Sequence, residues 1–135
     1  MIIEWKDKYS IGFKNIDEHH KHLVDLLNKT YRLMLDGDSK EDLSKILYEL
    51  IDYANYHFSA EEQLMDRYKH QFVKQHIAEH LYFMDRVLKF EKEFAGDNAD
   101  FTIEIFIFMK DWLLNHILIT DRLMGEDIKE HKDLA

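Results

Sequence analysis

The chain has 135 residues, of which 46% are hydrophobic, so it is long enough to bury the core of a globular domain. Its formal net charge of −9 argues against a nucleic-acid partner, because such a surface offers little to offset phosphate repulsion. The absence of cysteine excludes disulfides and thiolate metal sites, and the sequence has neither a run of apolar residues that could span a membrane nor a secretory signal.

An N-terminal arm (residues 1–15) precedes the first predicted helix, which covers about residues 17–35. Apolar residues recur there at helical steps, through Ile16, Leu23, Leu27, Tyr31 and Met34. His20 lies on the centre of this apolar face, whereas its neighbours His19 and His22 lie to either side of it. We therefore expect His20 to be the histidine that points into the core.

The second predicted helix covers about residues 40–66 and begins after Ser39, a hydroxyl residue suited to capping, with an acid three residues later. Its stripe steps by three and four residues, through Leu43, Leu47, Leu50, Ala54, His57, Glu61, Leu64 and Tyr68. An imidazole and a carboxylate, His57 and Glu61, therefore share the face that the helix should bury.

The third predicted helix covers about residues 73–94, and His76 and His80 lie one turn apart on its apolar stripe. The break before it, near His70, contains neither glycine nor proline, and we expect His70 to be solvated.

The fourth predicted helix covers about residues 100–124 and carries His116 on its apolar face, before a tail at 126–135. Asp121 follows His116 by five residues, which is about 140° around an ideal α-helix. Spacing alone therefore fits a core position and a polar residue in the last turn equally well. Glycines mark the expected breaks at Gly37, Gly96 and Gly125.

Four long helices with short connections predict an all-α fold, an up-down-up-down antiparallel four-helix bundle that forms a single domain over residues 1–135. Every helix places a histidine on its buried face. One such histidine is more often a hydrogen-bonded core residue than a ligand. Five histidines and a carboxylate would be costly to bury without a common partner, and a metal supplies one. The pattern therefore predicts a metal site inside the bundle.

Several motifs then resemble one known family, the hemerythrins, and in particular the bacterial hemerythrin domains. In chain order they are Trp5, YSIGF (9–13), IDEHHKHLVDLLN (16–28), HFSAEEQLM (57–65), HIAEH (76–80) and WLLNHILITD (112–121). Each motif alone is weak, but all of them in this order are specific. This chain has His70-Gln71 where the family usually has Tyr-Pro, and His19 where glutamine is common.

The resemblance implies two non-heme Fe ions (Fe2+/Fe3+) with an oxo or hydroxo bridge, held by five histidines and two bridging carboxylates. Carried over, the ligands of one iron are His76, His80 and His116, those of the other are His20 and His57, and the bridges are Glu61 and Asp121. The iron with two histidines keeps one open position, where a small ligand can enter. Glu62, beside the bridge, is expected to face solvent.

The function that this resemblance implies is reversible dioxygen binding by an oxygen carrier, store or delivery protein, which is not an enzyme. We expect it in the cytoplasm, with no nucleic-acid or membrane partner and with an oxygen-consuming protein as the recipient. An apolar pocket should cover the open position, lined by Leu23, Phe58, Trp112, Leu113 and Ile117. Ordinary core packing would account for these five residues equally well.

Three other functions are alternatives to reversible oxygen binding. The same scaffold can serve a di-iron enzyme that reduces nitric oxide or peroxide or oxidises ferrous iron, and a polar pocket residue would favour that use. It can also be an oxygen- or redox-sensing domain excised from a larger signalling protein. A metal-free interaction bundle is the third, and it leaves the buried histidines without a partner.

Overall fold

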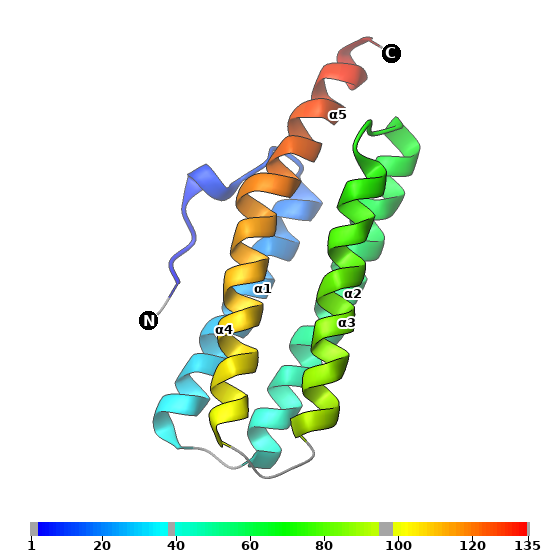
Figure 1. Cartoon of the computed structure of the whole chain (residues 1–135). Coiled ribbons are helices and arrows are strands. Elements are labelled where there is room, and N and C mark those ends of the chain that lie inside the picture. The colour runs from blue at the N-terminus through cyan, green and yellow to red at the C-terminus, as the bar shows by residue number, and fades with distance from the viewer. Residues whose placement is uncertain (1–2, 38–39, 95–98, 135) are drawn as a thin grey trace.

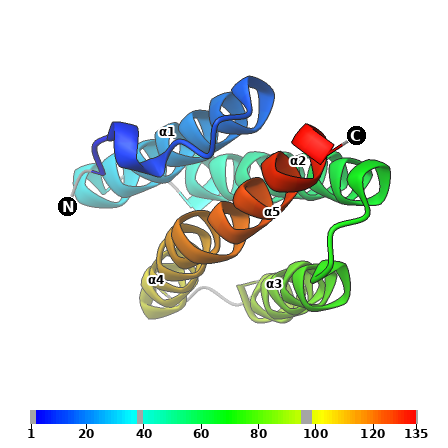
Figure 2. The ribbon, with the colours of Figure 1, turned by 90° about the horizontal axis from the view of Figure 1, so that it is seen from above.

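The structure, a computed structural model, describes residues 3–37, 40–94 and 99–134. Its long helices run alternately up and down and form the all-α four-helix bundle that the sequence predicts (Figure 1). They are α1 (Lys14–Asp36), α2 (Lys40–Tyr68), α3 (Val73–Phe94) and a last continuous helix composed of α4 (Ala99–Asn115), the π-helix η2 (His116–Asp121) and α5 (Arg122–Leu134). Neighbours in the chain pack side by side, and α1 also packs against α4, which closes the bundle (Figure 2).

Two of the glycines expected at breaks behave differently from each other. Gly37 ends α1 as predicted: its φ of 68° is left-handed, and its N–H bonds back to the carbonyls of Leu33 and Met34. Gly125 instead lies inside α5, and a Cβ there would stand 3.1 Å from the Cβ and the carbonyl oxygen of Ile11. This glycine therefore lets the N-terminal arm pack closely on the last helix. Gly96 lies outside the described residues.

The prediction of a tail at 126–135 is wrong for residues 126–134, which continue α5. The reason is that the segment has no proline and continues the apolar stripe of the helix, with Ile128 one turn after Met124 and both fully buried. This end of the helix therefore belongs to the bundle core.

The turn between α2 and α3 also differs from expectation. Lys69 ends α2 in the left-handed region, with a φ of 54°, although it is not a glycine. His70, predicted to be solvated, is only 3% exposed, because Asp127 of α5 covers it and its Nδ1 lies 2.6 Å from Asp127 Oδ2. Asp127 Oδ1 also accepts a bond from the side-chain amide of Gln71 at 2.9 Å. The extra length of α5 thus fixes the turn between α2 and α3. The side chain of His131, the histidine near the C-terminus, lies outside the described residues.

Among the described residues, the core consists of two apolar clusters, one toward each end of the bundle. The larger contains Leu23, Phe58, Phe83 and Leu113, and the smaller contains Ile11, Ile16, Met65, Met124 and Ile128. In each helix, the predicted ligands fall between residues of the first cluster and residues that pack in the second. The polar side chains therefore form a layer between two apolar layers, which keeps water away from it on both sides.

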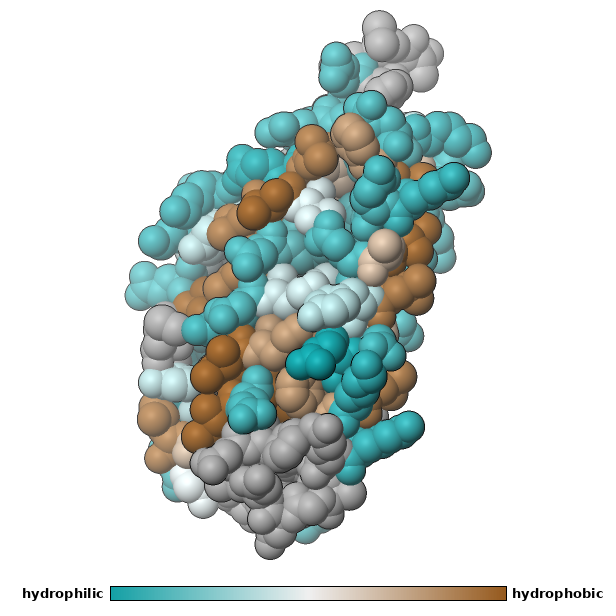
Figure 3. Space-filling model, viewed as in Figure 1, coloured by the Kyte–Doolittle hydropathy of each residue, from teal (hydrophilic) through white to brown (hydrophobic). Residues whose placement is uncertain are grey.

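The face drawn in Figure 3 is mainly polar, with apolar patches among the polar side chains. The most exposed apolar residues of the last helix are 44–66% exposed. They are Ile103, Ile107, Ile119 and Leu123. Across residues 3–37, 40–94 and 99–134, no helix combines the length and the apolar character needed to cross a lipid bilayer.

Candidate metal centre

All seven residues predicted as ligands lie in the polar layer, and each is at most 3% exposed. They come from the four sides of the bundle: His20 from α1, His57 and Glu61 from α2, His76 and His80 from α3, and His116 and Asp121 from η2. On α2 and α3 the spacing of four residues stacks two side chains one turn apart on the inner face. His19 and His22, in contrast, are only partly buried.

The π-helix accounts for the position of Asp121, which spacing on an α-helix had left open. Hydrogen bonds in a π-helix join residues five apart, so the residue five positions after another returns to the same side of the helix. Over His116–Asp121 the chain adopts this wider turn, and both end residues are buried. Asp121 Oδ1 consequently lies 3.0 Å from His116 Nε2.

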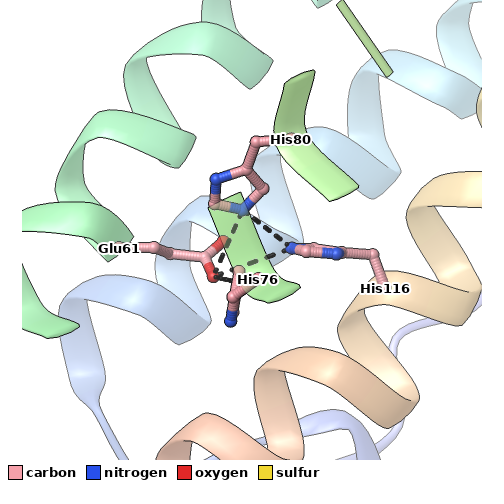
Figure 4. A group of neighbouring side chains, drawn as sticks. All are labelled: Glu61, His76, His80 and His116. Carbon is pink, nitrogen blue, oxygen red and sulfur yellow. Dashed lines mark hydrogen bonds and ion pairs between the residues drawn. The ribbon is translucent and has the colours of Figure 1, made fainter. Parts of the chain in front are cut away.

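The buried side chains form two groups of potential ligands that share one residue. The first group is Glu61, His76, His80 and His116, and the second is His20, His57, Glu61 and Asp121. Within each group the ligand atoms all lie within 4.8 Å of one another. Figure 4 shows that the side chains of the first group point toward a common centre from α2, α3 and the last helix.

Each of the two carboxylates directs one oxygen to each group. Glu61 Oε2 lies 2.8 Å from His76 Nε2, and Glu61 Oε1 contacts His57 Nε2. Asp121 Oδ2 lies 2.7 Å from His20 Nε2, and its Oδ1 lies 3.1 Å from His76 Nε2. Each carboxylate therefore faces both groups, as a bridge between two metal ions would.

Within the part of the chain that the structure describes, several buried atoms at this centre lie in close contact with neighbouring polar groups without forming a hydrogen bond to them. They are His57 Nε2, Glu61 Oε1 and Asp121 Oδ1. Such atoms are costly to bury, and a cation placed between them would satisfy all three. Imidazole nitrogens and carboxylate oxygens are suitable ligands for iron, and for manganese or zinc. The residues therefore fit a pair of divalent ions.

The pKa values of the buried groups also favour a cation at this centre. Burial alone would lower the pKa of His57, but Glu61 and Asp121 outweigh it and raise this pKa to about 9. Although burial raises the pKa of a carboxyl group, the surrounding histidines hold the pKa of Glu61 and of Asp121 below the usual range. His80 differs, because burial, together with the neighbouring His116, lowers its pKa to about 3. Two buried anions among imidazoles thus favour a positive charge at the centre.

Sequence reasoning missed the polar groups behind the histidines. Glu62, expected to face solvent, is only 37% exposed in its side chain, and its Oε2 lies 3.2 Å from His80 Nδ1. Glu79 Oε1 lies 3.2 Å from His116 Nδ1. His19 Nδ1 lies 3.0 Å from His57 Nδ1. The only sequence signal for Glu62 and Glu79 was their place next to a predicted ligand.

The five residues predicted to line an oxygen pocket lie close to the polar layer. Leu23, Phe58, Leu113 and Ile117 are at most 3% exposed, whereas Trp112 is half-buried. The Phe58 ring stacks on His80, with centroids 4.1 Å apart, and its centroid lies 6.1 Å from that of His57. Trp112 stacks on His116 at 4.6 Å, so its contact is with the group of three histidines.

Comparison with known proteins bears directly on this centre. The family model described as the hemerythrin HHE cation binding domain matches residues 11–128. The chain belongs to the hemerythrin family. Hemerythrins are a family of non-heme iron proteins that bind oxygen.

The relatives cover most of the chain. A bacteriohemerythrin from Clostridium acetobutylicum is 33% identical over 122 residues, which span 87% of this chain and 95% of the relative. A bacteriohemerythrin from Methylococcus capsulatus is 33% identical and covers 86% of each chain. A crystal structure of wild-type hemerythrin superposes with a TM-score of 0.83 at 28% identity and covers 95% of this chain and 98% of its own. The hemerythrin fold thus extends over nearly the whole molecule.

Proposed function

We propose that this hemerythrin binds dioxygen reversibly at a pair of irons, and acts as an oxygen carrier, store or delivery protein. The observation that carries the proposal is the placement of the two carboxylates, Glu61 and Asp121, each with one oxygen toward each group of histidines. Two ferrous ions held in this way would supply the electrons with which dioxygen is bound.

In this proposal the seven ligands have unequal roles. His76, His80 and His116 would hold one iron, and His20 and His57 the other, with both carboxylates between them. The half with only two histidines is the one with room for a small ligand. The chain contributes to reversibility by keeping water away from the centre. A change in the net charge of the centre would be poorly solvated there, so the dry surroundings favour a binding step that leaves this charge unchanged.

The apolar residues beside the centre support a binding function. Leu23, Phe58, Leu113 and Ile117 offer no acid or base that could deliver a proton, and they pack tightly enough to exclude water. A di-iron enzyme would need a proton donor in the pocket. None of these four, out of the five residues predicted to line the pocket, provides one.

The test is the visible spectrum of the iron-loaded, reduced protein, recorded without oxygen, after exposure to air and again after the oxygen is removed under argon. Reversible binding requires a new absorption band that appears with air and disappears under argon. A permanent ferric spectrum after the first exposure, or a spectrum that air never changes, would contradict the proposal. The first of these outcomes would favour an oxidase or reductase.

Glu61→Gln provides the comparison, because glutamine keeps the size of the side chain and removes the shared charge. We expect this variant to hold less than two irons per chain and to lose the air-dependent band. Glu41→Gln removes the same charge from an exposed position on α2, where Glu41 forms an ion pair with Lys45 at 3.7 Å. It should behave as the parent protein does.

A further inference from the structure

The two groups of histidines differ in what lies behind them. In the group of three, two outward nitrogens face carboxylates: His80 Nδ1 lies 3.2 Å from Glu62 Oε2, and His116 Nδ1 lies 3.2 Å from Glu79 Oε1. Glu79 is itself held, because the hydroxyl of Thr120 donates to its two oxygens at 2.8 and 2.9 Å. His76 Nδ1 is the one outward nitrogen in this group that has no hydrogen-bond partner.

The group of two histidines has no carboxylate behind it among the described contacts. His57 Nδ1 lies 3.0 Å from His19 Nδ1, and His20 Nδ1 has no hydrogen-bond partner. When Nε2 of His57 ligates a metal, its Nδ1 must carry the hydrogen and can donate it to His19. The partner on this side is therefore a neutral imidazole, which accepts through its lone pair.

These partners affect how strongly each half can hold a metal. A carboxylate that accepts the Nδ1 hydrogen fixes the imidazole in the tautomer that ligates through Nε2, and it makes that nitrogen more basic. Loss of such a partner typically lowers metal affinity by about 10- to 100-fold. A neutral imidazole orients His57 in the same way but adds no negative charge. The group of three also offers one more histidine ligand than the group of two, which likewise favours stronger metal binding in that group.

We propose that the two halves of the centre bind metal with unequal strength, and that Glu62 and Glu79 are the positioning residues that make them so. The half formed by His76, His80 and His116 fills first and empties last. The half formed by His20 and His57, where the open position lies, is the labile one. This inference rests on the proposed function, because it takes the two groups to be the two halves of one iron centre.

The experiment is an anaerobic competition between the reduced, iron-loaded protein and a ferrous chelator, with the iron retained per chain measured at rising chelator concentration. The unmodified chain should pass through a plateau at one iron per chain. Loss of both irons in a single step would overturn the inference. Retention of no iron at all would overturn the proposed function with it, whereas a single step together with reversible oxygen binding would overturn the inference alone.

Two variants assign the steps to the two halves. Glu79→Gln should release its last iron at a chelator concentration about 10- to 100-fold lower, with the first step changed much less. The exposed charge control, Glu41→Gln, should leave both steps in place. An unchanged last step in Glu79→Gln, or an equal shift of both steps, would overturn the role of Glu79.

A second variant, in the other half, distinguishes a specific loss of metal affinity from a general loss of folding. His20→Ala removes a ligand from the labile half, and we expect it to retain one iron, released at the same chelator concentration as the last iron of the parent chain. Circular dichroism verifies that its helix content is intact. A folded His20→Ala chain that held its one iron much more weakly than the parent holds its last would overturn the proposed order.

Discussion

Removal of the iron should leave a bundle that loses stability as the pH rises from 6.5 to 9. The basis is His57, whose pKa is raised to about 9 because Glu61 and Asp121 outweigh the effect of burial. A histidine whose pKa is raised by folding contributes its stability fully below the unfolded pKa of 6.5, and this contribution is lost as the pH rises through the folded value.

The magnitude follows from the two pKa values of His57. The difference between 6.5 and about 9 corresponds to about 3 kcal/mol, at about 1.4 kcal/mol for each pKa unit. The pKa values of His76 and His116 are raised by the same carboxylates, so they change stability in the same direction. His80 has a lowered pKa of about 3, and it acts only below pH 6.5, where it reduces stability as the pH falls.

The assay is urea unfolding of the chelator-treated protein at pH 6.5 and at pH 9, followed by far-ultraviolet circular dichroism. We expect a free energy of unfolding about 3 kcal/mol lower at pH 9. In the Glu61→Gln variant the difference should shrink, because the first of the two charges that raise the pKa of His57 is gone. A free energy of unfolding equal or higher at pH 9 in the unsubstituted chain would refute the reasoning.

Three further predictions concern the iron-loaded protein and the turn. Because imidazoles must be unprotonated to ligate, iron should be released as the pH falls to about 4–5; full retention of iron there, measured by elemental analysis, would contradict the histidine ligands. Leu113→Asn should keep the iron but speed the change to a permanent ferric spectrum, since it brings a polar group and water to the centre. An unchanged rate of this oxidation would show that Leu113 does not line the pocket. His70→Ala should lower the free energy of unfolding by about 2 kcal/mol, because it removes the buried hydrogen bond to Asp127. An unfolding curve that matches that of the parent protein would show that this contact adds nothing to stability.

The sequence was sufficient where regular geometry determines the position of a side chain. The pairs His57–Glu61 and His76–His80 follow from the spacing of four residues, because two side chains one turn apart must share a helix face. His20 lies in the core because it is in phase with Ile16 and Leu23. The four-helix bundle follows from the same periodicity.

Features that depend on irregular backbone or on distant contacts could not be predicted in this way. The position of Asp121 depends on a π-helix, and no residue pattern in HILITD announces that wider turn. His70 became buried through Asp127, which is 57 residues away in the chain. Gly125 serves a close approach of Ile11 and not the end of a helix, and only the packed structure reveals that difference.

The wider turn at 116–121 also constrains how the gene can vary. The buried stripe of the last helix contains Ile105, Met109, Leu113 and His116 up to the first residue of the turn, and Asp121, Met124 and Ile128 from its last residue onward. An ordinary α-helix would carry these two halves out of phase by about one residue, so the π-helix acts as a single inserted residue that restores their alignment. A one-residue deletion inside 117–120 would bring His116 and the aspartate to a spacing of four, which an ordinary α-helix keeps on one face, so the helix end that covers His70 would stay in phase. Deletion of one outward-facing residue of this segment, such as Ile119, which is 66% exposed, should consequently disturb the packing of the helix less than a deletion elsewhere along it, which would rotate everything that follows by about 100°.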